Sequence, residues 1–202
     1  MKEPLITPTK VVGGAIAIYE DTWNDFSETI SDLVLELGDS FVSAKVVDTK
    51  TGKTYVNDVR NNDAIRIKSN SDPESYLKKL DKRCKELVDL FVKSYKDVFN
   101  ISENILDREE YTLLRYSPGQ YYHEHYDGGT ETARSISVLI YLNDDYSGGE
   151  IEFVNFNEKI KPKAGTIILF PSNYAYRHIA HPVLSGTKYV IVTWLHDREK
   201  EF

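Results

Sequence analysis

The chain has 202 residues, of which 41% are hydrophobic and 28% are charged, and its formal net charge is −7. This length suits one domain with a core and is too short for two ordinary ones, and the composition is that of a globular protein. The acidic balance disfavours nucleic acid as a general partner, because the chain would repel a phosphate backbone.

Signals for other compartments are absent from the sequence. The single cysteine, Cys84, excludes an intramolecular disulfide, which fits a reducing environment. The opening MKEPLITPTK lacks the apolar run of a secretory signal, and nowhere do 18 uninterrupted apolar residues occur. We therefore expect a cytoplasmic protein that does not span a membrane.

The first half of the chain predicts a short strand at residues 15–19, followed by a helix. The helix would begin at a cap formed by Asp21 or Thr22 and end near Leu37, with Gly38 as its stop. Apolar residues three or four positions apart predict one buried face. They are Trp23, Phe26, Ile30, Leu33, Val34 and Leu37.

A second, longer helix is predicted after a hairpin of residues 42–47 and 54–59. Asp72 would cap this helix, and Pro73 would occupy its first position. A long apolar stripe follows, consisting of Leu77, Leu80, Cys84, Leu87, Val88, Phe91, Tyr95 and Val98. Cys84 lies on the stripe, so we interpret it as a core residue and not as a nucleophile.

The second half is rich in β-branched and aromatic residues, which favour strands. Strands are predicted at residues 111–116, 135–142, 150–153, 166–170 and 189–195. Turn signals separate them: Ser117-Pro118-Gly119, Ser147-Gly148-Gly149, Pro162 with Gly165, and Ser185-Gly186. Short strands at this spacing indicate a sandwich or jelly roll, with the earlier helices packed on one face.

The segment QYYHEHYDGG, residues 120–129, is the most informative part of the sequence. On an extended strand alternate residues face the same way, so His123, His125 and Asp127 could share a face. One imidazole and one carboxylate, joined by a second histidine, would form the triad that leaves open positions on Fe(II). A His-x-Asp pair alone is a weak signal, because a loop histidine beside an acid is common.

A distant histidine followed by a basic residue strengthens this interpretation. His178 precedes Lys188 by ten positions, and Lys188 comes directly before the apolar segment 189–194. If that lysine pointed into a pocket, it would require a carboxylate partner, since burying an unpaired charge is costly. An exposed lysine on an edge strand is the alternative.

Several short motifs occur in order through the second half of the chain. They are LRYSPGQ (114–120), HYD (125–127), YLND (141–144), GGE (148–150), PKAG (162–165), HIAHPV (178–183) and WLH (194–196). With Arg134 and Lys188, they resemble the catalytic core of the prolyl 4-hydroxylases, within the iron and 2-oxoglutarate dioxygenase superfamily. As a set these motifs are specific, although most are weak alone.

The resemblance implies an α+β protein built on a double-stranded β-helix, or jelly roll, with supporting helices on one face. It implies one dioxygenase domain over residues 1–202, with helical support and N-terminal strands in 1–108 and the catalytic jelly roll in 109–197. It also implies hydroxylation with Fe(II), 2-oxoglutarate and O2, releasing succinate and CO2, with ascorbate as a candidate reductant. Prolyl residues in a peptide or protein are the best substrate guess.

The same resemblance assigns site residues. The implied metal ligands and catalytic residues are His125, Asp127 and His178. Lys188 would pair with the distal carboxylate of 2-oxoglutarate, and Tyr116 and Tyr141 would line that pocket. Arg134, Trp194 and His196 match positions linked to peptide binding.

Some alternatives stay open at this point. His123 and His181 are extra histidines, and His181 is a competitor of His178 for the third ligand position. The carboxylate of Asp127 occupies the position where a halide could otherwise bind, so hydroxylation is favoured over halogenation.

Three other functions compete with a peptide hydroxylase. The first is a hydroxylase of a small molecule or free amino acid. The second is a non-enzymatic cupin-like metal-binding module, which His123-x-His125 fits but the distant Glu131 does not. The third is an inactive scaffold, against which the intact triad and Lys188 argue.

Overall fold

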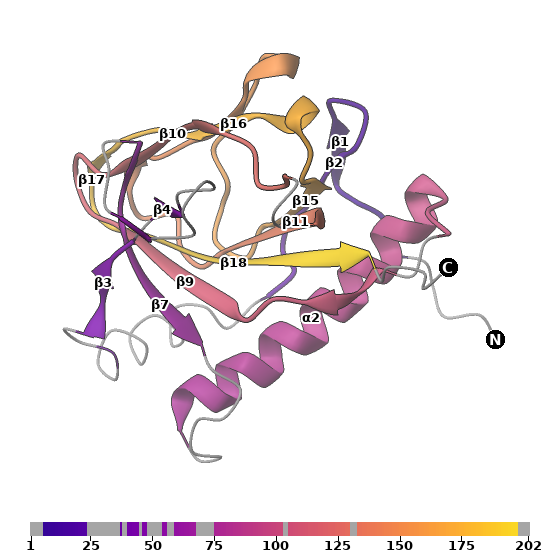
Figure 1. The fold of residues 1–202 in the computed structure, drawn as a ribbon, viewed down its shortest axis with the longest axis horizontal. Coiled ribbons are helices and arrows are strands. Elements are labelled where there is room, and N and C mark those ends of the chain that lie inside the picture. The colour runs from indigo at the N-terminus through magenta and orange to yellow at the C-terminus, as the bar shows by residue number, and fades with distance from the viewer. Residues whose placement is uncertain are drawn as a thin grey trace.

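The computed structural model describes residues 6–23, 37, 40–44, 46–47, 54–55, 59–67, 75–102, 105–129 and 133–197. Within these residues, two antiparallel sheets face each other, and one long helix covers the outer face of the larger sheet (Figure 1). This double-sheet arrangement confirms the predicted jelly roll with helical support.

The larger sheet contains strands from both halves of the chain. In spatial order they are β1 (Lys10–Val12), β2 (Ile16–Tyr19), β15 (Ile167–Pro171), β11 (Arg134–Tyr141), β18 (Lys188–Asp197), β9 (Tyr111–Tyr116), β7 (Asp63–Ile67) and β3 (Val42–Ser43). Strand β8 (Ile105–Arg108) also pairs with β18. Neighbours in this sheet are mostly distant in sequence, so its order could not follow from hairpins alone.

The smaller sheet lies opposite. Its order is β14 (Glu158–Ile160), β13 (Ile151–Phe153), β16 (His178–Ala180), β10 (Tyr121–His125) and β6 (Arg60–Asn61). Two short pairs complete the described strands: β12 (Ser147–Gly148) with β17 (Val183–Ser185), and β4 (Val46–Val47) with β5 (Thr54–Tyr55). Two 3-10 turns, η2 (Val154–Phe156) and η3 (Tyr174–Tyr176), flank β14 and β16.

Side chains on the two faces of the larger sheet belong to two separate hydrophobic cores. Successive side chains of a strand point to opposite faces. On β11, Ile136, Val138 and Ile140 therefore pack toward the helix, whereas Leu139 and Tyr141 pack between the sheets. The central strands are consequently apolar on both faces, which is why they read as nearly continuous hydrophobic segments.

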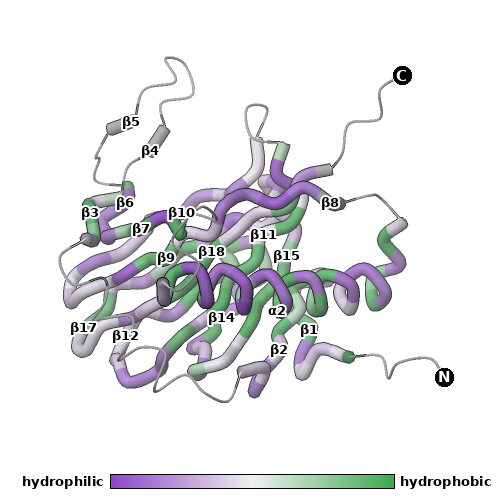
Figure 2. The backbone as a smooth tube through the Cα atoms, turned by 90° about the horizontal axis from the view of Figure 1, so that it is seen from below, coloured by the Kyte–Doolittle hydropathy of each residue, from purple (hydrophilic) through white to green (hydrophobic). Residues whose placement is uncertain are grey.

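Helix α2 (Tyr76–Phe99) crosses the outer face of the larger sheet (Figure 2). Six of the eight predicted stripe residues are buried, while Leu77 and Val98 are only partly buried. Cys84 is fully buried, so its interpretation as a core residue is confirmed. Burial raises the pKa of the Cys84 thiol, which keeps it protonated. At the far end the hydroxyl of Tyr95 donates to the carbonyl oxygen of Ala15 at 2.8 Å, tying the helix to the β1–β2 turn.

The predicted start of this helix is wrong by three residues. Ser75 is the N-cap, and its hydroxyl accepts a hydrogen bond from the backbone N–H of Lys78 at 3.3 Å. Serine is among the best N-caps, so it competes successfully with the upstream Asp72-Pro73 signal. Asp72 and Pro73 themselves lie outside the described residues.

Other predicted elements have mixed outcomes. The strand predicted at 15–19 is β2, and those of the second half appear as β9, β11, β13, β15 and β18. Within the described residues, the predicted hairpin appears as β4 with β5, whereas β3 pairs with β7. The first predicted helix lies almost wholly outside the described residues. No helix within the described ranges has the length and apolar character required to cross a bilayer.

Candidate metal centre

Three side chains from the smaller sheet converge at one point. His125 ends β10, Asp127 follows it by two residues, and His178 begins β16. His125 and His178 are direct partners in the antiparallel pairing of these strands. The ligand atoms of all three side chains lie within 4.8 Å of one another. The two Nε2 atoms lie 3.7 and 3.9 Å from the Asp127 carboxylate, which is an arrangement that could hold a metal ion.

Backbone carbonyls orient both imidazoles. Nδ1 of His125 donates to the carbonyl oxygen of His123 at 2.7 Å, and Nδ1 of His178 donates to that of Tyr176 at 3.1 Å. Each bond places the proton on Nδ1 and leaves the Nε2 lone pair directed at the common point. Burial, assisted by His178, lowers the pKa of His125 to about 3, so this ring stays neutral near pH 7.

The carboxylate is held in its charged form. Burial raises the pKa of Asp127, but His178, His125 and the hydrogen bond from Ser137 outweigh it and hold this pKa below its usual range. The hydroxyl of Ser137 donates to Oδ2 of Asp127 at 2.6 Å, and Ser172 lies 2.8 Å from Ser137. The site therefore presents the neutral imidazole of His125 and the charged carboxylate of Asp127, the protonation states that metal ligands need.

The two extra histidines lie apart from this cluster. Nε2 of His181 is bonded to Glu152 at 2.6 Å, and the structure brings His178 to Asp127 instead. The ring of His123 is exposed and contacts Tyr121. A register shift in β10 between Tyr122 and His125 accompanies this separation, so simple alternation did not hold here.

Lys188 is buried, which excludes the alternative of an exposed edge lysine. It begins β18 opposite Tyr116 of β9 and is 2% exposed. Its ammonium donates to the carbonyl oxygen of Gly149 at 3.0 Å and lies 4.3 Å from the centroid of the Tyr116 ring. Burial, assisted by Lys161, lowers the pKa of Lys188 to about 7. Among the described residues no carboxylate forms an ion pair with it, so the site suits an acidic ligand.

Tyr116 and Tyr141 belong to the buried cluster between the sheets. Burial raises the pKa of both phenols, so both hydroxyls stay protonated and can donate hydrogen bonds. Phe170 of the same cluster packs edge-on against His178, with ring centroids 5.1 Å apart. The aromatic cluster thus connects the histidine end of the site to the lysine end.

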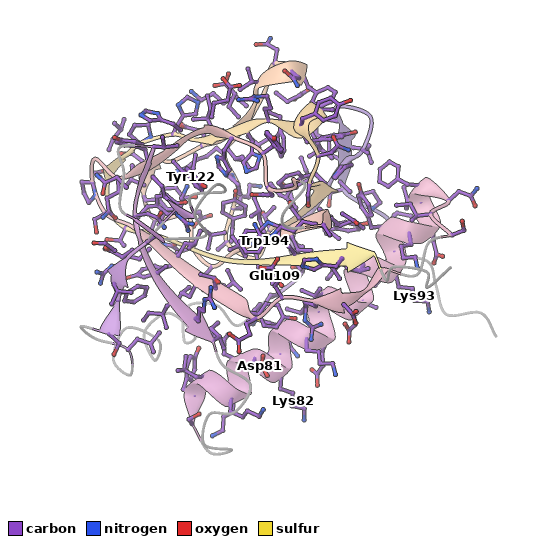
Figure 3. The ribbon with its side chains drawn as sticks, in the orientation of Figure 1. Asp81, Lys82, Lys93, Glu109, Tyr122 and Trp194 are labelled. Carbon is purple, nitrogen blue, oxygen red and sulfur yellow. The ribbon has the colours of Figure 1, made fainter. Side chains whose placement is uncertain are left out.

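The three residues predicted to bind a peptide also meet in the structure. The guanidinium of Arg134 lies 3.6 Å from the centroid of the Trp194 ring, and Arg134 pairs with His196 in the sheet register. Sequence reasoning missed the residue that joins them, Glu109. Its carboxylate accepts two hydrogen bonds from Arg134, at 2.6 and 2.8 Å, and contacts Nε2 of His196 at 2.9 Å. Figure 3 shows Glu109 beside Trp194.

A second missed group lies on the other side of His125. The Tyr122 ring stacks on the His125 ring, with centroids 3.5 Å apart, and Arg60 lies 4.9 Å from the centroid of the Tyr122 ring. Arg60 belongs to β6 and is the register partner of Tyr122. No local motif marks Arg60, because only the pairing of β6 with β10 places it there.

Comparisons with known proteins show which proteins the chain resembles. Residues 111–196 match the family described as the 2OG-Fe(II) oxygenase superfamily. The prolyl 4-hydroxylase subunit alpha-1 of Gallus gallus is 30% identical over 211 residues, which cover 91% of this chain and 38% of that protein. The chain spans less than half the length of the curated relatives that head the comparison.

Two solved structures share the fold. One is a prolyl hydroxylase from Trichoplax adhaerens in complex with a peptide fragment of the hypoxia inducible factor oxygen degradation domain, with a TM-score of 0.71 and 21% identity over 92% of this chain and 84% of that one. The other is a viral collagen prolyl hydroxylase from Paramecium Bursaria Chlorella virus-1 in a 2OG complex, with a TM-score of 0.62 and 23% identity, covering 91% and 96%. The predicted resemblance to prolyl 4-hydroxylases is confirmed.

Proposed function

We propose that this chain, a prolyl 4-hydroxylase-like protein by its sequence match, is an Fe(II)- and 2-oxoglutarate-dependent dioxygenase that hydroxylates prolyl residues in a peptide or protein. One observation carries the proposal. His125, Asp127 and His178 converge in the same jelly roll that buries Lys188 without a carboxylate partner among the described residues.

The triad fits Fe(II) by its chemistry. Two imidazoles and one carboxylate are the ligand set of non-haem Fe(II) oxygenases, and they leave positions open for a chelating co-substrate and O2. When bound, the metal and 2-oxoglutarate supply oxygen activation, with release of succinate and CO2. The protein fixes the orientation of the ligands by hydrogen bonds. The carbonyls of His123 and Tyr176 hold the two imidazoles, and the hydroxyl of Ser137 holds the carboxylate.

The other end of the site fits a dicarboxylate. The ammonium of Lys188 would pair with the distal carboxylate of 2-oxoglutarate, while Gly149 keeps the lysine oriented. The Tyr116 hydroxyl, protonated because its pKa is raised by burial, is a second donor for that carboxylate. The aromatic cluster excludes water from this pair, which strengthens its electrostatic attraction.

A peptide is the substrate class that the rim supports best. Arg134, stacked on Trp194, lies directly beside the metal centre, because its guanidinium also donates to the backbone carbonyl of Asp127 at 3.4 Å. A planar cation on an indole ring, with His196 nearby, offers donors and a flat apolar surface to an extended chain. The Trichoplax adhaerens neighbour, solved with a peptide fragment, supports this choice.

The test is a turnover assay with Fe(II), 2-oxoglutarate and ascorbate over a panel of proline-containing peptides and free amino acids. We expect succinate formation and a gain of one oxygen on prolyl residues, detected by mass spectrometry. Asp127→Ala should abolish both, whereas His181→Gln is the matched control outside the triad and should retain them. Absence of any succinate from metal-loaded protein would reject the enzyme and favour a cupin-like module or a scaffold.

A second outcome separates the substrate classes. If Arg134→Ala loses peptide turnover and keeps the uncoupled conversion of 2-oxoglutarate, the peptide assignment stands. If the panel yields oxygen only on free amino acids or other small molecules, the enzyme stands and the peptide assignment fails.

A further inference from the structure

A groove of about 550 Å³ lies outside the metal centre, between the N-terminal half of α2 and the connection from β8 to β9. Its wall carries five cations, namely Lys78, Lys79, Lys82, Lys85 and Arg108, and it includes Tyr111 at the start of β9. Figure 3 labels Asp81 and Lys82 on the helical side and Glu109 on the sheet side. The groove therefore opens beside the residues that surround Arg134.

The groove is locally basic although the whole chain is acidic. Three acids, Asp81, Glu109 and Glu110, accompany the five cations, in a chain whose net charge is −7. Glu109 is already engaged by Arg134 and His196. Among the described residues, Lys79, Lys82 and Lys85 form no ion pair. Three lysines are thus available to an anionic partner.

The position of the lysines in the helix increases the positive potential. Lys78 and Lys79 lie in the first turn of α2, which contains no acidic residue. The N-terminal end of a helix carries a partial positive charge, so cations there are unfavourable for folding. Lys78 pairs with Asp81 at 3.9 Å, whereas Lys79 forms no ion pair among the described residues, so an acidic ligand would compensate its position.

A buried hydroxyl gives independent evidence of a ligand. Tyr111 is 1% exposed and lines the groove, and its hydroxyl has no hydrogen-bond partner among the described residues. A buried hydroxyl without a partner is costly, and native structures contain few of them. A carboxylate in the groove would give this hydroxyl an acceptor.

Glu109 makes the groove continuous with the proposed substrate site. This residue lines the groove, and its carboxylate binds Arg134 and His196 beside the metal centre. A chain that leaves the Arg134–Trp194 surface past Glu109 would enter the groove. In Figure 3, Glu109 lies between Trp194 and the helical residues Asp81 and Lys82.

We propose that the groove binds an acidic segment of the peptide or protein substrate, adjacent to the proline-containing segment at the metal centre. This inference rests on the proposed function. Lys79, Lys82 and Lys85 follow one another at i, i+3 spacing along the helix, each roughly one turn of about 5.4 Å from the next. Alternate residues of an extended peptide are about 7 Å apart, so alternate acidic side chains can reach successive lysines. The substrate would therefore carry acidic residues near, and not at, the target proline.

The test uses the full chain and two labelled peptides of equal length. Both contain the same proline-rich segment, followed by alternating Glu residues in one and alternating Gln residues in the other. We expect Lys82→Glu/Lys85→Glu to weaken binding of the Glu peptide by roughly tenfold at low salt, less at high salt, with little change for the Gln peptide. Lys93→Glu/Lys163→Glu reverses two exposed lysines outside the groove and is the matched control for net charge. Fluorescence anisotropy measures the binding of each peptide to the parent protein and to both variants.

A second variant guards against disturbed folding. Tyr111→Phe removes only the hydroxyl, so it should leave thermal stability unchanged or higher while it weakens binding of the Glu peptide several-fold. If Tyr111→Phe instead binds both peptides like the parent protein, the hydroxyl does not serve a ligand, and the assignment is overturned.

The remaining outcomes separate this inference from the proposed function. Lysine-dependent binding of the Glu peptide without oxygen transfer would reject the hydroxylase and keep the groove. Oxygen transfer that is equal for both peptides and insensitive to the lysines would keep the hydroxylase and overturn the groove. Concentration-dependent self-association that Lys82→Glu/Lys85→Glu abolishes would assign the groove to a second acidic copy of the chain and overturn the substrate assignment.

Discussion

The side chain of Lys188 shows how one residue can be placed for a ligand at a cost to the free protein. Its ammonium has a backbone carbonyl and an aromatic ring as partners, and no carboxylate among the described residues. Burial therefore lowers its pKa to about 7. A dicarboxylate that restores the charged form would recover part of this cost on binding.

The pH dependence of co-substrate binding follows from this shift. Above pH 7 the free lysine is neutral and must take up a proton to bind an anion, so affinity for 2-oxoglutarate should fall as the pH rises beyond 7, by at most tenfold per unit. Below pH 7 Lys188 is already protonated, so it adds no further pH dependence to the affinity for 2-oxoglutarate. Calorimetry on Mn(II)-loaded protein in two buffers of different ionisation enthalpy should show proton uptake at alkaline pH.

Lys188→Arg is the control for that measurement. A guanidinium stays charged over the whole range, so the alkaline loss should disappear even if the affinity itself is lower. An alkaline loss of the same size in Lys188→Arg would assign it to another group.

Glu109 is predicted to act on the peptide and not on the co-substrate. Its two bonds to Arg134 fix the guanidinium over Trp194. Glu109→Gln removes the charge from both bonds, and charge-assisted bonds are roughly twice as strong as neutral ones. We expect the KM for a peptide without acidic residues to rise roughly tenfold, since weakening the hydrogen bonds that orient Arg134 costs about 1 to 2 kcal/mol. Steady-state kinetics should show an unchanged KM for 2-oxoglutarate; an equal rise in both would contradict this role.

At the scale of elements, strands composed mainly of buried apolar side chains could be predicted from the sequence. Most side chains of β9 and β18 are buried and the other described ones are partly buried, and their apolar runs predicted these strands to within a residue or two. β10 and β16 were not predicted, because their short segments carry histidines and tyrosines that face the metal centre or solvent. Where a strand positions ligands, the hydrophobic pattern weakens.

The same division applies to the site residues. His125 and Asp127 are close in sequence, and His178 and Lys188 are separated by a fixed spacing, so motifs could indicate all four. Glu109 could not be placed from local sequence, since its contact with His196 depends on how β8 and β18 pair. Long-range register is decided by the packing of the whole sheet, which no short motif encodes.

Lys161, in the connection after β14, holds a neighbouring loop of the candidate site in place. The ammonium of Lys161 donates to the carbonyl oxygens of Tyr146 and Gly148, at 3.0 and 2.6 Å, and lies 3.3 Å from the centroid of the Tyr146 ring. It thereby holds the loop that presents the Gly149 carbonyl to Lys188. Gly149 has a φ of +66°, and a Cβ there would lie 2.9 Å from the Tyr146 ring, so the loop has little freedom to compensate.

Lys161→Met should therefore raise the KM for 2-oxoglutarate several-fold, with kcat nearly unchanged at saturation. Lys161→Arg should restore much of the loss, because a guanidinium can donate to both carbonyls. Steady-state kinetics over a range of co-substrate concentrations separates the two parameters. A fall in kcat with constant KM, or no rescue by Arg, would show that Lys161 does not position the loop.

At the scale of the whole molecule, the two halves of the candidate site belong to different sheets. The triad lies on the smaller sheet, and Lys188 lies on the larger one, which α2 supports from outside. A ligand that contacts both ends would therefore bridge the sheets across the aromatic cluster between them. Ligand binding should consequently increase the free energy of unfolding of the whole fold, and not only order a local loop.

Thermal unfolding tests this bridging. A ligand at 100 times its Kd stabilises the native state by about 2.7 kcal/mol, which for a chain of this size corresponds to a rise in Tm of roughly 5 to 10 °C. We expect one rise with Mn(II) and a second when 2-oxoglutarate is added. His178→Ala should lose both rises, because the co-substrate chelates the metal. Lys188→Met should keep the first and lose most of the second, while its ligand-free Tm is equal or higher, since the variant no longer buries an amine. A full second rise in Lys188→Met would show that the diacid does not reach the larger sheet.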